Sequence, residues 1–100
     1  MAYVVVWEFK VRPRMRKRFE RAYGPRGVWA NLFRRDPAYI RTETMQDARD
    51  GSRYLTVDFW KSQAAYEAFR KKRIEDYQRI DALCEQMTEA EREVGRFRLR

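Results

Sequence analysis

The residues that this 100-residue sequence lacks exclude several functional classes. It contains no histidine, so a histidine general base and a histidine metal or haem ligand are both unavailable. A single cysteine, Cys84, excludes an internal disulfide and predicts a reducing, cytoplasmic compartment. A lone thiol without a histidine to activate it is typical of a structural cysteine rather than a catalytic one.

Long apolar runs are also missing. The first apolar segment, Tyr3 to Trp7, is interrupted by Glu8 and has no basic residues before it, unlike a signal peptide. No stretch approaches the roughly 20 apolar residues of a membrane-spanning helix. We therefore expect no membrane association.

The composition suits a single domain over residues 1–100, since 44% of the residues are apolar and 15% are aromatic. A chain of this length buries only about 60–65% of its unfolded surface, so we expect a partner to add to its stability. The net charge of +8 arises entirely within residues 1–41, which hold 11 Lys and Arg against 3 Asp and Glu. This excess indicates either a phosphate-binding face or, as we favour, a solvated arginine-rich helix face.

Alternating apolar residues predict strands, and apolar residues at helical spacing predict helices between them. In the third strand, we expect the set containing Leu55, Val57 and Phe59 to face the helices and Asp58 to face away. Ser62 is a suitable N-cap, and Thr88 with Glu91 has the spacing of a capping box for one last helical turn. The predicted strands span 3–11, 39–45, 53–60 and 94–100; the predicted helices span 13–23, broken by Gly24-Pro25 and resumed over 28–33, and 62–87, with a bend in the basic run 70–73.

This order predicts a ferredoxin-like βαββαβ α+β fold with a four-stranded antiparallel sheet. Helices then cover one face of the sheet and leave the other face apolar and open. A second copy of the sheet is the simplest cover for that face, so we expect a homodimer.

Three segments together resemble the antibiotic biosynthesis monooxygenase family of the dimeric α/β-barrel superfamily. They are the opening strand that runs through Phe9-Lys10-Val11-Arg12-Pro13, the strand Tyr39-Ile40-Arg41-Thr42-Glu43, and Tyr54 to Tyr66, in which a strand ending in Trp60 precedes a Ser-capped helix. The resemblance implies a dimeric α/β barrel that oxygenates a small aromatic or polyketide-like compound without a metal or organic cofactor. The family also contains haem-degrading enzymes, but their functional positions fall here on Trp7, Phe69 and Arg79, none of which matches.

The resemblance places a ligand pocket between the sheet and the helices. A phenol held there as its anion requires apolar walls and a few polar groups. Arg41 and Asp58 are the candidates for these polar groups. Each candidate also has a structural explanation, because the rings can simply fill the core and Arg41 or Asp58 can form an ion pair. The helix break at 24–27 is the predicted ligand entrance. The candidate substrate-binding residues are Trp7, Tyr23, Trp29, Asn31, Arg41, Tyr66 and Phe69.

Two further functions compete with an oxygenase. One is a non-catalytic dimer that binds a small ligand, which the absence of histidine favours. The other is nucleic-acid binding, because RNA-recognition domains share this order of elements. Their Lys/Arg-Gly-aromatic signature is missing from residues 53–60, so we do not favour a nucleic-acid partner.

Overall fold

The computed structural model describes residues 2–100. It contains one strand, a pair of helices, two strands, a second pair of helices and a last strand, in that order. Two short 3₁₀ turns, Pro13–Met15 and Glu85–Met87, precede the first α-helix and follow the last one. The predicted break in the first helix and the predicted bend in the second are both present. The elements are β1 (Tyr3–Val11), α1 (Arg16–Tyr23), α2 (Val28–Phe33), β2 (Tyr39–Gln46), β3 (Arg53–Trp60), α3 (Gln63–Lys72), α4 (Ile74–Cys84) and β4 (Thr88–Arg98).

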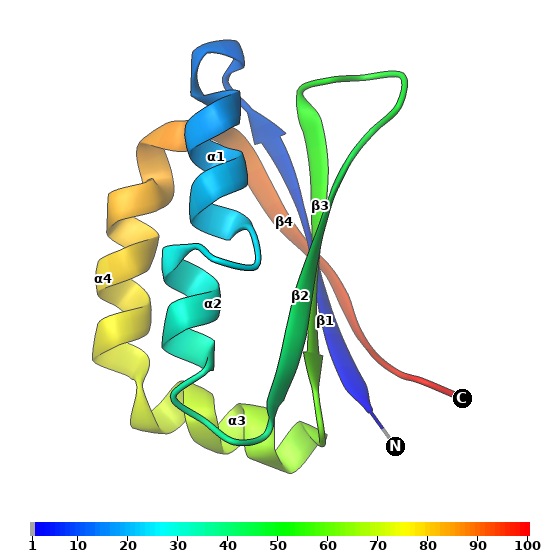
Figure 1. The fold of residues 1–100 in the computed structure, drawn as a ribbon, viewed down its shortest axis with the longest axis vertical. Coiled ribbons are helices and arrows are strands. Elements are labelled where there is room, and N and C mark those ends of the chain that lie inside the picture. The colour runs from blue at the N-terminus through cyan, green and yellow to red at the C-terminus, as the bar shows by residue number, and fades with distance from the viewer. Residues whose placement is uncertain (1) are drawn as a thin grey trace.

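The strands form one antiparallel sheet in the order β2-β3-β1-β4. All four helices lie on the same side of this sheet, with α1, α2 and α4 along it and α3 across its lower end (Figure 1). The ferredoxin-like βαββαβ fold expected from the sequence is therefore confirmed. None of the helices within residues 2–100 is long and apolar enough to cross a membrane.

The two halves of the first helix meet at a very close backbone approach. A Cβ atom at Gly27 would lie 2.2 Å from the carbonyl oxygens of Arg21 and Ala22, so no other residue fits there without moving the chain. Pro25 follows the end of α1, where it cannot continue the helix. The break turns α2 so that Trp29 and Phe33 reach the core.

Ser62 caps α3 as predicted, because its Oγ accepts a hydrogen bond from the backbone N–H of Ala65 at 3.1 Å. The helix ends at Lys72, and α4 begins at Ile74. The basic run 70–73 therefore does mark a change of direction. This bend brings α4 alongside α2 (Figure 1).

The prediction for the faces of β3 is wrong. The register pairs Tyr54 with Phe9 and Trp60 with Tyr3, and directly opposed residues point to the same face of the sheet. Tyr54 and Trp60 are 1% and 0% exposed, so the even-numbered residues of β3 face the helices. The two large rings decide the orientation of the strand, and Asp58 therefore lies on the inner face with them.

The predicted helical turn at Thr88 is also wrong. A 3₁₀ turn over Glu85–Met87 ends α4, and Thr88 begins β4 opposite Val11. The backbone N–H of Arg12 donates to the carbonyl of Met87 at 3.0 Å. One side of β1 pairs with β3, and the backbone groups on its other side need partners along the whole strand. Pairing of β4 with these groups outweighs the local capping pattern.

Candidate functional site

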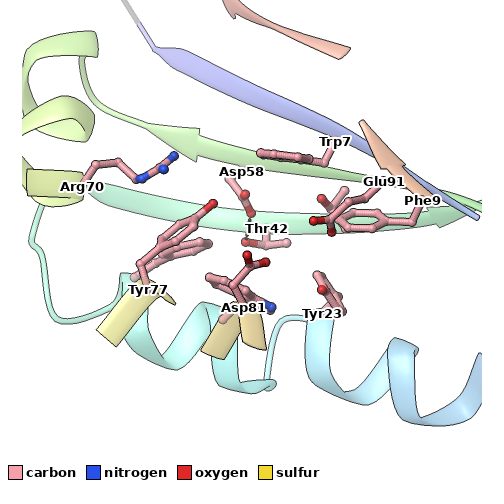
Figure 2. Close-up of a pocket in the computed structure, with 12 residues that line it drawn as sticks. Trp7, Phe9, Tyr23, Thr42, Asp58, Arg70, Tyr77, Asp81 and Glu91 are labelled. Atoms are coloured by element: carbon pink, nitrogen blue, oxygen red, sulfur yellow. Dashed lines mark hydrogen bonds between the residues drawn. The ribbon is translucent and has the colours of Figure 1, made fainter. Parts of the chain in front are cut away.

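A cavity of about 190 Å³ lies between the inner face of the sheet and the helices. Side chains from all four strands and all four helices contribute to its wall, with those of the sheet facing those of the helices (Figure 2). The lining residues are Trp7, Phe9, Tyr23, Trp29, Phe33, Thr42, Thr56, Asp58, Arg70, Tyr77, Asp81 and Glu91.

Aromatic rings form most of the wall on the helix side. Trp29 contacts Tyr77 edge to face, with ring centroids 4.8 Å apart, and Tyr23 at 6.0 Å. Burial raises the pKa of both tyrosine hydroxyl groups well above the ordinary value, so both remain neutral at physiological pH. The indole N–H of Trp29 is buried beside the hydroxyl of Tyr23 and the thiol of Cys84.

A chain of hydrogen bonds ends on Asp58 in the centre of the cavity wall. The hydroxyl of Thr42 donates to the Asp58 carboxylate at 2.6 Å. Since that proton is already used, the hydroxyl of Tyr39 must be the donor in its 2.7 Å contact with Thr42. The strand register explains this arrangement, because Thr42 on β2 lies directly opposite Asp58 on β3.

Asp58 is 9% exposed and holds a titratable carboxylate in apolar surroundings. Burial raises its pKa to about 6, and the hydrogen bond from Thr42 offsets only part of that effect. A carboxylate with a pKa this close to neutrality is suited to accept a proton from a bound ligand.

Arg70 supplies the positive charge of the cavity. Its guanidinium group donates to the hydroxyl of Tyr66 at 2.9 Å and stacks 4.0 Å above the ring of Tyr77. It forms no ion pair with a carboxylate of residues 2–100, and its Nε has no hydrogen-bond partner. Figure 2 shows it extending from α3 towards Asp58. A partly buried cation of this kind can stabilise a ligand anion.

Two exposed carboxylates, Asp81 on α4 and Glu91 on β4, belong to the cavity wall. They indicate that the cavity opens between α4 and the edge strand β4. The predicted entrance at the helix break 24–27 is not supported, because no residue of that segment lines the cavity and the flanking Tyr23 and Trp29 are buried.

Of the predicted substrate-binding residues, the structure brings Trp7, Tyr23 and Trp29 together around the cavity. Tyr66 and Phe69 are buried in the adjacent core, where both rings pack against Trp60. The other two predicted residues lie elsewhere on the molecule.

Asn31 is exposed on α2 and accepts a hydrogen bond from Arg34 at 2.9 Å. Arg41 is on the outer face of the sheet, where it stacks 3.9 Å above the ring of Phe59 and pairs with Glu43 at 2.9 Å. Neither residue reaches the cavity.

Sequence reasoning did not place Arg70, Tyr77, Asp81 or Glu91 at the site. Tyr77 and Asp81 are four residues apart, so a common helix face was foreseeable. Glu91 lies opposite Phe9 on the inner face of the sheet. The capping-box pattern predicted a helical turn at this place instead of a strand, so this position of Glu91 was not expected. No group of three or more Asp, Glu, Cys or His within residues 2–100 is arranged to hold a metal ion.

A four-stranded antiparallel sheet with helices on one face and an aromatic cavity between the two layers defines a ferredoxin-like α+β domain. The chain belongs to the antibiotic biosynthesis monooxygenase family, whose family model matches residues 2–82. This match includes every lining residue of the cavity except Glu91.

Solved structures of low sequence identity share the fold. A single-residue mutant of SnoaB, a cofactor-independent oxygenase from Streptomyces nogalater, superposes with a TM-score of 0.81 at 16% identity, covering 99% of this chain and 93% of that chain. A conserved protein from Methanosarcina mazei Go1 gives 0.73 at 13% identity, covering 100% and 94%. No curated protein matches the chain.

Proposed function

We propose that this protein is a cofactor-independent monooxygenase of a small phenolic compound. The observation that carries the proposal is Asp58, a buried carboxylate with a raised pKa in the wall of an aromatic cavity that also contains Arg70. The family membership and the fold shared with SnoaB support it.

Asp58 acts as the general base in this proposal. It removes the phenolic proton of the ligand, and Thr42 and Tyr39 hold the carboxylate in place by their hydrogen bonds. Arg70 stabilises the phenolate that results. The electron-rich phenolate can then donate an electron to O2, which the neutral phenol does less readily.

The reaction balances without an external reductant. One electron passes from the phenolate to O2, and the resulting radicals combine to form a carbon–oxygen bond on the ring. Loss of water from the ring hydroperoxide then gives a quinone. One O2 is consumed, one oxygen atom enters the ring and the other leaves as water, with all four electrons supplied by the substrate.

The cavity volume limits the size of the substrate. A cavity of roughly 150 Å³ accommodates benzene, and this one measures about 190 Å³. The enclosed space therefore suits one substituted ring, and a larger polycyclic compound would have to extend through the opening between α4 and β4.

A homodimer formed through the open sheet face is part of the proposal. Val57 and Phe59 lie in the middle of this face, and the neighbouring Met45 and Phe97 are 44% and 49% exposed. A second copy would remove this apolar surface from water, which is the usual reason for such a patch.

A non-catalytic ligand-binding protein is the alternative. The observation that favours it is the 2.6 Å hydrogen bond of Asp58, which satisfies part of the carboxylate without any ligand. Under this alternative, phenols bind but are not consumed.

Oxygen uptake tests the proposal. Phenol, 2,6-dimethylphenol and 1-naphthol are incubated with the protein while O2 and the para-quinone are measured. We expect one O2 per quinone, and a loss of at least about 100-fold in rate for Asp58→Asn, which removes the base. Binding without turnover supports the alternative, and an Asp58→Asn variant that retains the full rate contradicts the role of Asp58.

A further inference from the structure

We propose that the cavity selects aromatic ligands that carry a basic amine, with the ammonium group held between Asp81 and Glu91. This inference rests on the proposed function, because it places the phenolic end of the same ligand beside Asp58 and Arg70. It narrows the substrate class from small phenols to phenols with a cationic substituent.

The balance of charges in the cavity wall is the first argument. Asp58, Asp81 and Glu91 line the cavity together with a single cation, Arg70. None of these three carboxylates has a Lys or Arg partner within 4.0 Å in the part of the chain that the structure describes. In a protein with a net charge of +8, this acidic cavity contrasts with the rest of the molecule.

The position of the carboxylates is the second argument. Asp81 projects from α4 and Glu91 from β4, on opposite sides of the cavity (Figure 2). Burial and the nearby charges of Asp81 and Glu85 raise the pKa of Glu91. A cation between the carboxylates would relieve this repulsion, whereas an anion would increase it.

The aromatic wall is the third argument. The faces of tyrosine and tryptophan rings attract ammonium groups, and Arg70 already occupies such a position above Tyr77. Tyr23 and Trp29 line the same cavity, and the charge of Glu91 acts on the hydroxyl of Tyr23. An ammonium group in this part of the cavity would therefore contact aromatic rings as well as carboxylates.

These groups also define the orientation of the ligand. Arg70 lies at one end of the cavity and Glu91 at the other, with Asp58 between them (Figure 2). A ring with a hydroxyl group at one end and an ammonium group at the other matches this order of charges. A neutral phenol satisfies only the first half of it.

Three phenols with the same ring and a short carbon chain test the inference by calorimetric titration at neutral pH. Tyramine carries an ammonium group, 4-ethylphenol is neutral and 3-(4-hydroxyphenyl)propionate is an anion. We expect tyramine to bind at least about tenfold more tightly than 4-ethylphenol, and the anion to bind most weakly. The preference for tyramine should decrease with added salt, because the acidic groups are partly exposed.

Charge-removing variants assign the preference to the two carboxylates. Asp81→Asn and Glu91→Gln together should abolish the difference in affinity between tyramine and 4-ethylphenol. Glu75→Gln is the matched control, because Glu75 is an exposed residue of α4 that does not line the cavity. It should leave all three affinities unchanged.

The outcomes separate this inference from the proposed function. Equal affinities for the three phenols overturn the amine preference but leave an aromatic site and the oxygenase proposal intact. A tyramine preference that survives the double substitution overturns the assignment to Asp81 and Glu91. If none of the three binds, the cavity is not a phenol site and both proposals fail.

Discussion

Thr42 and Asp58 lie directly opposite each other on β2 and β3 and share a hydrogen bond of 2.6 Å on the inner face of the sheet. This contact allows a carboxylate to remain in a wall that is otherwise largely aromatic. It lowers the pKa of Asp58, whereas burial raises it, and burial is the larger effect. The resulting pKa of about 6 leads to two predictions.

The first prediction concerns stability against pH. Because the folded-state pKa of Asp58 is about 6 and the reference value is 3.8, the folded protein binds this proton more tightly than the unfolded chain. The free energy of unfolding contributed by Asp58 is therefore highest below about pH 4 and falls as the pH rises through 6. The loss amounts to about 3 kcal/mol.

Urea unfolding of the wild type and of Asp58→Asn at about pH 4 and about pH 8 measures this effect. The free energy of unfolding of Asp58→Asn minus that of the wild type should increase by about 2–3 kcal/mol from the lower pH to the higher pH. The comparison between the two proteins cancels the titration of the other carboxyl groups. A difference that is independent of pH would show that Asp58 titrates normally.

The second prediction concerns activity against pH. If Asp58 is the base, kcat/KM should rise with pH around an apparent pKa of about 6. Thr42→Val removes the hydrogen bond that favours the charged carboxylate, so this rise should move to higher pH. Thr42→Ser keeps the hydroxyl group and should restore the wild-type profile, which a merely structural role for Thr42 would not require.

The third prediction concerns the break between α1 and α2. Gly27→Ala places a Cβ atom 2.2 Å from two backbone carbonyl oxygens, so the chain must move. We expect a loss of about 2 kcal/mol or more in the free energy of unfolding, measured in urea. Gly51→Ala is the control, because the added atom meets only the side-chain ends of Arg16 and Gln46 at 3.2 Å or more. Equal losses in both variants would contradict the prediction.

The fourth prediction concerns the open face of the sheet. Val57→Glu places a charge in the middle of this face and should convert a dimer into a monomer at micromolar concentration, as measured by light scattering. Leu83→Glu changes a side chain that is 72% exposed on the helix layer and should leave the dimer intact. A wild-type protein that is already monomeric would show that the sheet face stays uncovered.

The order of the elements could be predicted well from the sequence, because alternation and helical spacing are local signals. The broken first helix followed from Gly24-Pro25, and the start of α3 followed from Ser62. The face of β3 did not follow, since Asp58 and Thr56 make its inner side look like the solvent side. Only the pairing of Tyr54 and Trp60 with the rings of β1, a long-range property, reverses that interpretation.

The candidate site was predicted only in part for a similar reason. Trp7, Tyr23 and Trp29 are conspicuous aromatic residues, and two of them flank the predicted helix break. Arg70, Asp81 and Glu91 come from three separate elements, and on their own each resembles an ordinary surface charge. Their common location depends on the bend at Arg73 and on the early start of β4.

Glu91 lies on an edge strand and Asp58 on an inner strand, so the two positions tolerate substitution differently. Asp58 lies on an inner strand of the sheet, where a substitution disturbs hydrogen bonds and packing on both sides. Glu91 has a neighbouring strand on one side only and lies beyond the residues that the family model matches. Substitutions at position 91 should therefore change the ligand preference that we propose for the cavity without disturbing the inner strand that holds Asp58.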